Sequence, residues 1–237
     1  MAPLLPVTPR LITFDTYGTL IDWDSALRSY IGRLFAAKGV QRDVRRFHEN
    51  WYYRHALPAV AGPFQPYRPL LEKTMALALS EVGVAADPKE LSALGDVMAD
   101  AAPFADAVSV LSVLKQHVPL ATISNSQQDI IEISARKLGD PFTFIFTGEI
   151  VEAYKPHPAL FELVLDRAGV QPHEVVHVAQ SQYVDLPRSV SMGIPTVWIN
   201  RQQQQLDPHT PVPTAELPDL HGLPSLLNYP HGNGSQL

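Results

Sequence analysis

The chain has 237 residues, 46% of them hydrophobic, which is enough to bury a full core as one domain or as a domain with an insertion. With no cysteine it can form neither a disulfide nor a thiol nucleophile, which fits a reducing cytoplasm. The net charge of −6 argues against a nucleic-acid partner, and no apolar run approaches the ~20 residues of a membrane span, so neither partner is expected.

The beginning of the chain lacks the basic and long apolar regions of a secretory signal peptide, so we expect a cytoplasmic protein. Residues 11–14 (Leu-Ile-Thr-Phe) then suit a buried strand, and Asp15 follows them directly. Gly18 permits a sharp turn, which predicts an exposed Asp15 carboxylate where the strand ends. A carboxylate that only caps the turn is the alternative.

The next segment, 22–102, is predicted to be all helical. Asp22 and Asp24 offer an N-cap, and apolar residues recur at helical spacing until Gly39. Three further helices are expected, at 43–59, 67–82 and 88–101. Because no strand signal interrupts them, we interpret 22–102 as an inserted helical domain.

From Pro103 strands alternate with helices. Strands are expected at 119–123, 142–146, 175–179 and 195–199, and helices at 105–117, 127–138, 158–168 and 186–192. This pattern implies a parallel sheet whose reactive groups gather beyond the carboxyl ends of the strands. After the last of these strands we expect a mobile connector at 202–205 and 208–213, a final strand or helix at 217–227, and a disordered tail at 229–237.

Two short motifs follow predicted strands. Ser124-Asn125-Ser126 opens a helix and offers a hydroxyl, an amide and backbone N–H groups to an anion, although Ser124 as a simple N-cap remains an alternative. Lys155-Pro156 precedes another helix. A lysine close to Asp15 would favour its ionised, nucleophilic form, whereas a solvated surface lysine would have no such role.

Four segments occur in the order of the four motifs of the haloacid dehalogenase superfamily. They are Asp15-Thr-Tyr-Gly-Thr19, Ser124-Asn125, Lys155-Pro156, and His177 to Asp185 followed by Met192 to Arg201. Between residues 11 and about 201 the chain resembles the superfamily and, within it, the type II (S)-2-haloacid dehalogenases. The resemblance implies a Rossmann-like α/β core with a parallel sheet at 1–21 and 103–237, and an inserted helical cap domain at 22–102.

Most members of that superfamily are magnesium phosphatases or phosphotransferases. They carry a general acid two residues after the nucleophile and an Asp metal ligand in the fourth motif, where this chain has Tyr17 and Gln180. Magnesium prefers carboxylate oxygens, and a phosphate ester needs the acid, whereas a halide leaves without a proton. We therefore expect no metal and no other cofactor.

The resemblance implies that Asp15 attacks the carbon that bears the leaving group, and that water then hydrolyses the aspartyl ester. It also implies roles for other residues: Thr19 and Ser124 hold a substrate carboxylate or orient Asp15, Asn125 contacts the leaving group, Lys155 stabilises the Asp15 charge, Asp185 orients or activates water, and Tyr17 forms a pocket wall. The expected partner is a small-molecule substrate, and the family suggests a homodimer.

The chain also departs from the dehalogenase pattern. Gln180 and Gln182 replace Ser and Asn, Phe161 replaces Tyr, and the nearest match to an arginine of the cap is Phe47-His48. Histidine is a poor substitute for the guanidinium group of arginine, which is always charged and can bind a carboxylate through two hydrogen bonds. Other candidates for the cap arginine, none of which aligns with it, are Arg45, Arg46, Arg54 and Arg68. His48 and Gln182 are thus candidates for contact with the substrate or leaving group.

Three alternatives to a 2-haloacid dehalogenase remain. The same carboxylate could open another small electrophile such as a strained cyclic amino acid, Asp15 and Asp185 could support a magnesium-dependent phosphatase, or the domain could be a silent binding module. The aromatic residues Trp51, Tyr52, Tyr53, Phe64 and Tyr67 are expected to line a pocket, or to form the cap core or a dimer contact. His157 and His177 are expected to be structural.

Overall fold

The computed structural model describes Leu5 and residues 7–229. All six strands are parallel, in the order β3-β2-β1-β4-β5-β6. Their bounds are β1 Leu11–Phe14, β2 Leu120–Ser124, β3 Phe144–Thr147, β4 Val175–Ala179, β5 Thr196–Ile199 and β6 Ala215–Leu217. Because β2 and β3 extend the sheet to one side of β1 and the later strands to the other, the winding reverses beside β1, where such sheets place their ligands. The expected parallel α/β fold is confirmed.

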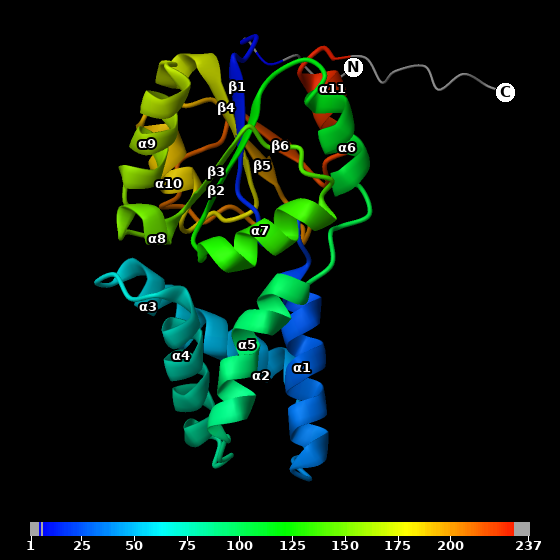
Figure 1. The fold of residues 1–237 in the computed structure, drawn as a ribbon, viewed down its shortest axis with the longest axis vertical. Helices are drawn as coiled ribbons and strands as arrows, with labels where there is room; N and C mark the ends of the chain where they lie inside the picture. The colour runs from blue at the N-terminus through cyan, green and yellow to red at the C-terminus, as the bar shows by residue number, and fades with distance from the viewer. Residues whose placement is uncertain (1–4, 6, 230–237) are drawn as a thin grey trace, which may run out of the picture.

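Helices cover both faces of the sheet (Figure 1). Leu11 packs with Phe161 of α9 (Ala159–Ala168), whereas Ile12 and Phe14 pack with α6 (Ala107–Leu114) and α11 (Leu223–Leu226). All of β1 is therefore buried, and its sequence has no polar face toward solvent. The remaining helices of this part are α7 Gln128–Lys137, α8 Gly148–Val151, the 3-10 turn Pro172–Glu174 and α10 Leu186–Ser191.

The helices between β1 and α6 group together beyond one end of the sheet, below it in Figure 1. They are α1 Trp23–Ala37, α2 Val44–Trp51, α3 Leu57–Ala61, α4 Tyr67–Glu81 and α5 Pro88–Asp100, and they share a hydrophobic cluster of their own. The chain enters and leaves this unit through paired segments, where Asp22 N–H donates to Ala102 O over 2.8 Å and Phe104 N–H to Leu20 O over 2.9 Å. Treating 22–102 as a separate cap domain remains our proposal.

The helix expected at 43–59 contains an irregularity. Its backbone stays helical from α2 into α3, but Tyr52–Ala56 forms a π-helical segment between them. Pro58 explains the wider turn, because its ring cannot donate a hydrogen bond and would clash with the carbonyl four residues earlier in a regular helix. Tyr52 and Tyr53 are the first two residues of this segment.

The connector expected after β5 makes hydrogen bonds with the core, and its mobility at 202–205 and 208–213 stays a prediction. Gln204 N–H donates to Asn200 Oδ1 over 2.8 Å, and Asp207 N–H donates to Gln182 Oε1 over 2.7 Å. The region expected to be one strand or helix supplies the end of β6 and all of α11. Of the expected tail, 230–237 lie outside the described residues. Within the described residues no helix has the length and apolar character needed to cross a membrane.

Candidate active site

Asp15 lies at the carboxyl end of β1, with its backbone N–H bonded to Val178 O of β4 at 3.0 Å. The following turn brings Thr19 back to the carboxylate, where the Thr19 hydroxyl donates to Asp15 Oδ2 over 2.8 Å. Thr19 Oγ1 in turn accepts from the Gln180 N–H at 2.9 Å, which fixes its direction. Asp15 is only 7% exposed, so the prediction of an exposed carboxylate is wrong, because the turn folds over the strand end.

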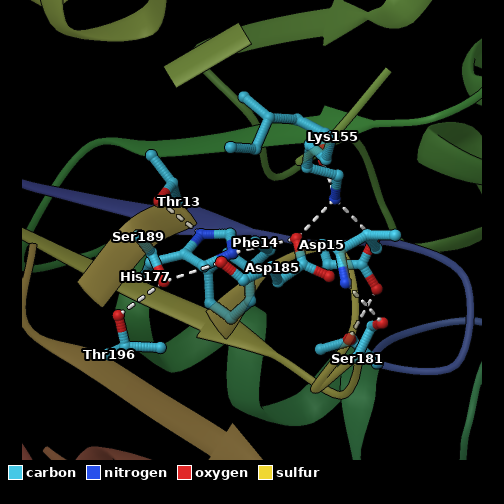
Figure 2. A network of polar contacts seen from close by, with 12 residues as sticks. Thr13, Phe14, Asp15, Lys155, His177, Ser181, Asp185, Ser189 and Thr196 are labelled. Atoms are coloured by element: carbon cyan, nitrogen blue, oxygen red, sulfur yellow. Dashed lines mark hydrogen bonds and ion pairs between the residues drawn. The ribbon is translucent and has the colours of Figure 1, made fainter. Parts of the chain in front are cut away.

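Lys155 is fully buried and points at Asp15 (Figure 2). Its ammonium lies 2.9 Å from Asp15 Oδ1, 2.7 Å from Asp185 Oδ1 and 2.9 Å from Ile123 O. An ammonium has three N–H donors, so all of them are engaged. Asn125 fixes the lysine backbone, because its amide accepts from Lys155 N–H at 2.7 Å and donates to Lys155 O over 3.0 Å.

Asp185 precedes α10 and lies behind Lys155, away from the two cavities described below. Its Oδ1 atom accepts from Lys155 Nζ and also lies 3.2 Å from His177 Nε2. Its Oδ2 atom is buried and has no hydrogen-bond partner within the described part of the chain. Asp185 therefore contacts Asp15 through Lys155, and a direct contact with hydrolytic water has no support from the cavity lining.

The pKa values of the two carboxyl groups move in opposite directions. Burial raises the pKa of Asp15, and the Lys155 ammonium lowers it by less, while the nearby Asp185 charge raises it further. Burial also acts to raise the pKa of Asp185, but Lys155 and His177 outweigh it and the pKa is lowered. Burial tends to lower the pKa of Lys155, whereas the two carboxylates raise it. Lys155 is thus held in its charged form. As pH falls, Asp15 becomes protonated before Asp185, because the pKa of Asp15 is raised and that of Asp185 is lowered.

A cavity of about 100 Å³ opens beside Asp15. The core contributes Asp15, Tyr17, Ser124, Asn125 and Lys155 to its lining. The helical unit contributes aromatic and aliphatic walls, among them Trp51, Tyr52, Leu57, Tyr67, Leu70 and Leu71. Ser124 Oγ is buried and has no partner within the described residues, so it is available to a ligand. The cavity fits a small, largely apolar molecule with one or two polar groups.

Tyr17 forms part of this wall, as the sequence predicts. Its hydroxyl is 3.0 Å from Ser134 Oγ, and burial raises its pKa to about 12. The expected anion site at the start of α7 is largely taken by protein groups, because Glu149 Oε2 accepts from the Gln128 N–H at 2.9 Å. In that motif both Ser124 Oγ and Ser126 Oγ lack a partner among the described residues, and of the two only Ser124 lines the cavity.

A second cavity of about 630 Å³ lies between the helical unit and the loops after β4 and β5. It shares Trp23, Tyr52, Gln180 and Ser181 with the smaller cavity, so the two adjoin. His48 lines this larger cavity, with Nδ1 at 3.1 Å from Asp24 Oδ1, but does not line the smaller one. The structure therefore does not bring His48 directly to Asp15.

The structure also leaves Gln182 out of both cavities. The Gln182 amide holds the connector, with Nε2 at 3.2 Å from Gln204 Oε1 and Oε1 accepting from Asp207 N–H. The prediction that Gln182 contacts substrate finds no support in this geometry. Among the unaligned cap arginines, three are paired with carboxylates: Arg45 with Glu49, Arg54 with Glu81, and Arg68 with Asp96 and Asp129.

Two residues near the site were given no catalytic or binding role from the sequence: Arg201 had none at all, and His177 was expected to be structural. Arg201 donates to Thr19 O over 2.9 Å and forms a bidentate pair with Asp106, at 2.9 and 3.0 Å, which anchors the turn that carries Thr19. His177 is fully buried beside Asp185. The sequence indicates that His177 lies near the site, because His177 belongs to the fourth motif. No pattern in the sequence indicates that Arg201 pairs with Asp106.

The donor set does not fit a magnesium ion. A divalent cation shared by Asp15 and Asp185 would need the region between their carboxylates, and Lys155 Nζ occupies it. Gln180 adds an amide where a carboxylate would be the stronger ligand. The buried ammonium of Lys155 already places a positive charge beside both carboxylates.

Comparisons with known proteins identify relatives of this chain. The family model for haloacid dehalogenase-like hydrolases matches residues 9–187. The (S)-2-haloacid dehalogenase H-109 of Pseudomonas putida is 26% identical over 216 residues, covering 88% of this chain and 93% of the relative. The (S)-2-haloacid dehalogenase of Pseudomonas sp. strain YL is 25% identical over 230 residues, covering 95% and 97%.

Solved structures show the same fold. The L-2-haloacid dehalogenase of Xanthobacter autotrophicus with chloropropionic acid covalently bound superposes with a TM-score of 0.80 at 20% identity, covering 93% of this chain and 98% of that one. A defluorinating L-2-haloacid dehalogenase superposes with a TM-score of 0.80 at 24% identity, covering 95% and 98%.

Proposed function

The chain belongs to the haloacid dehalogenase-like hydrolases, and from this premise we propose that it is a metal-independent dehalogenase that cleaves a small 2-haloacid through an ester on Asp15. The observation that carries the proposal is a buried Asp15–Lys155 pair, 2.9 Å apart, facing a cavity of about 100 Å³ with apolar and aromatic walls. The matched relatives named as (S)-2-haloacid dehalogenases support the choice of substrate.

In the first step a carboxylate oxygen of Asp15 attacks the carbon that bears the halogen. A carbon–oxygen bond forms, the carbon–halogen bond breaks, and the halide leaves with the electron pair and inverts the carbon. Lys155 and Thr19 each donate to a different oxygen of Asp15, which orients the carboxylate before attack. The step needs no general acid, in keeping with Tyr17 at the position two residues after Asp15.

In the second step water attacks the carbonyl carbon of the aspartyl ester. The Lys155 ammonium, which contacts Asp15 Oδ1, stabilises negative charge that develops on that oxygen. One water proton ends on the hydroxyl of the hydroxy-acid product, and the other is released when Asp15 ionises again. Asp185 remains as the carboxylate partner of Lys155 while Asp15 is esterified.

The remaining roles follow from position. Ser124 Oγ, which has no described partner, holds the substrate carboxylate, and Asn125 and Tyr17 complete the polar and aromatic walls near the leaving group. His48 acts farther out, where the substrate enters or the halide leaves through the larger cavity. Asp24 stays ionised beside His48, since His48 and Arg28 together lower the Asp24 pKa against the opposite effect of burial.

A second candidate substrate is another small electrophile, such as a strained cyclic amino acid. The small cavity would hold the strained ring beside Asp15, among the same lining residues. Its aromatic walls also suit a cationic leaving group. The Asp15 ester would be common to both reactions.

The test is halide release from (S)-2-chloropropionate with and without EDTA. We expect turnover that survives the chelator and disappears in Asp15→Asn, with exposed Asp166→Asn as a control that retains it. A single turnover in ¹⁸O water should place label in the Asp15 side chain. Magnesium-dependent release of phosphate from p-nitrophenyl phosphate, without halide release, would contradict the proposal.

A further inference from the structure

A row of buried polar side chains crosses the sheet behind Asp15. Thr13 of β1 is the register partner of His177 of β4, and His177 is the partner of Thr196 of β5, so the three share one face of the sheet. All three are fully buried. Polar residues in the centre of a parallel sheet destabilise the fold unless their polar groups are hydrogen-bonded, so each of these three side chains needs a partner.

His177 has a partner at each ring nitrogen (Figure 2). Nδ1 lies 2.9 Å from Thr13 Oγ1, and Nε2 lies 3.2 Å from Asp185 Oδ1. One neutral tautomer satisfies both contacts, with the Thr13 hydroxyl donating to Nδ1 and the Nε2–H donating to Asp185. The ring also packs edge-on against Phe161, with centroids 5.0 Å apart.

We propose that His177 is a positioning residue of the Asp15 site, acting through Asp185 and Lys155. Within the described residues, the Asp185 side chain has two polar contacts, Lys155 and His177, and both are made by Oδ1. Lys155 alone would allow the carboxylate to rotate around that contact. The second contact fixes its rotation, and Asp185 then fixes where the ammonium lies.

The consequence reaches Asp15 because the ammonium is shared. If Asp185 rotates, Lys155 follows it or loses its 2.7 Å contact, and the 2.9 Å contact with Asp15 changes in either case. Displacements of about 1 Å in a reacting group can cost on the order of 10²-fold in rate. His177 does not line the cavity that holds the substrate, so substrate binding should be little affected.

This inference rests on the proposed function, and its first test uses kcat and KM for halide release. His177→Phe keeps a ring against Phe161 but removes the donor to Asp185, so we expect kcat to fall about 10- to 100-fold with KM nearly unchanged. His177→Gln places an amide N–H within reach of Asp185 and should restore most of kcat. Equal losses in both variants would indicate packing alone and would overturn the inference.

Two variants in the same row serve as further checks. Thr13→Val removes the hydrogen-bond partner of His177 Nδ1, so that the position of the ring proton is no longer fixed. This variant should lose less of kcat than His177→Phe. Thr196→Val removes a hydroxyl that bonds to Ser189 Oγ and Ile194 O but not to His177, so it should leave kcat and KM near the wild-type values. A loss in Thr196→Val as large as in His177→Phe would count against a specific role for His177.

A second measurement does not need turnover. In protein labelled with ¹³C at the Asp γ-carbon, the signals of Asp15 and Asp185 can be assigned from the Asp15→Asn and Asp185→Asn variants. We expect both signals to shift in His177→Phe and to return in His177→Gln. Unshifted signals would overturn the inference, whereas absent halide release by the wild-type protein would overturn only the proposed function.

Discussion

Lys155 lies closer to Asp185 than to Asp15, with its Nζ atom 2.7 Å from one carboxylate and 2.9 Å from the other. The ammonium is therefore shared between the proposed nucleophile and a second carboxylate that lines neither cavity. Since each carboxylate depends on the same cation, a change at any one of the three residues should alter the other two.

Lys155→Met should destabilise the protein strongly. Removing the buried ammonium leaves two carboxylates without a counter-charge, and breaking a buried pair in this way costs about 3–5 kcal/mol in the free energy of unfolding. Urea denaturation near neutral pH measures this loss in the free energy of unfolding. The matched control is Lys137→Met, whose partly exposed ammonium pairs with Asp100 and should cost about 1 kcal/mol or less. Similar losses in the two variants would contradict the prediction.

The pH profile of the first chemical step should change in Asp185→Asn. Asp15 must be ionised to attack, and its pKa is raised by burial, against the effect of Lys155, and further by the Asp185 charge. The rate should therefore fall, as pH decreases, at a pH above the usual range for an aspartate. Asp185→Asn removes the like charge and should move this acidic limb of kcat/KM to lower pH. A limb that stays in place or moves upward would show that Asp185 does not influence Asp15 as described.

Tyr17→Phe should reduce the rate at which the free energy of unfolding falls with pH under alkaline conditions. The Tyr17 pKa is raised to about 12 in the folded protein by burial, against roughly 10 for an unfolded chain. Its stabilising contribution is thus fully present below the unfolded pKa and is lost between these two values, because the unfolded chain releases the proton first. One such group changes the unfolding free energy by about 1.4 kcal/mol per pH unit. Urea denaturation across this window should give a slope smaller by one proton in the variant.

Gly18→Ala should impair both stability and turnover. Gly18 has a φ of +92°, and an added Cβ would lie 3.0 Å from Gln180 Oε1 and 3.3 Å from Trp23 Nε1. Strain there shifts Thr19, which orients Asp15. Gly39→Ala is the control, because Gly39 also has a positive φ, of +64°, but nothing within 4 Å of the new atom. Both should lose about 1 kcal/mol or more of stability, and only Gly18→Ala should lose activity.

The features predictable from the sequence are those encoded by neighbouring residues. The apolar run before Asp15, the turn at Gly18 and the alternation of strands and helices fix the fold class, because each depends on local pattern. Lys155 could be expected near Asp15 because Lys155-Pro156 stands third in the order of the superfamily's motifs. The resemblance to a family supplied the order of the motifs.

Other features depend on the register of strands or on the direction of a loop, which short patterns do not encode. His177 contacts Thr13 because β1 and β4 pair in a particular register, and Arg201 meets Asp106 across 95 positions of sequence. Gln182 is in the expected motif, but its side chain turns toward the connector and holds Asp207. Motif position therefore located the neighbourhood of the site and did not decide which side chains face the cavity.

The π-helical segment Tyr52–Ala56 gives this enzyme a simple route to altered selectivity. Tyr52 of this segment lines the small cavity, and Tyr53 packs against Tyr183 of the core, with their ring centroids 5.9 Å apart. Each residue of a regular helix advances by about 100°, so deleting one residue here would turn every later side chain of α3 by that angle. A lineage could thereby exchange one wall of the pocket in a single genetic event, while Asp15 and Lys155, which come from other segments, stay in place.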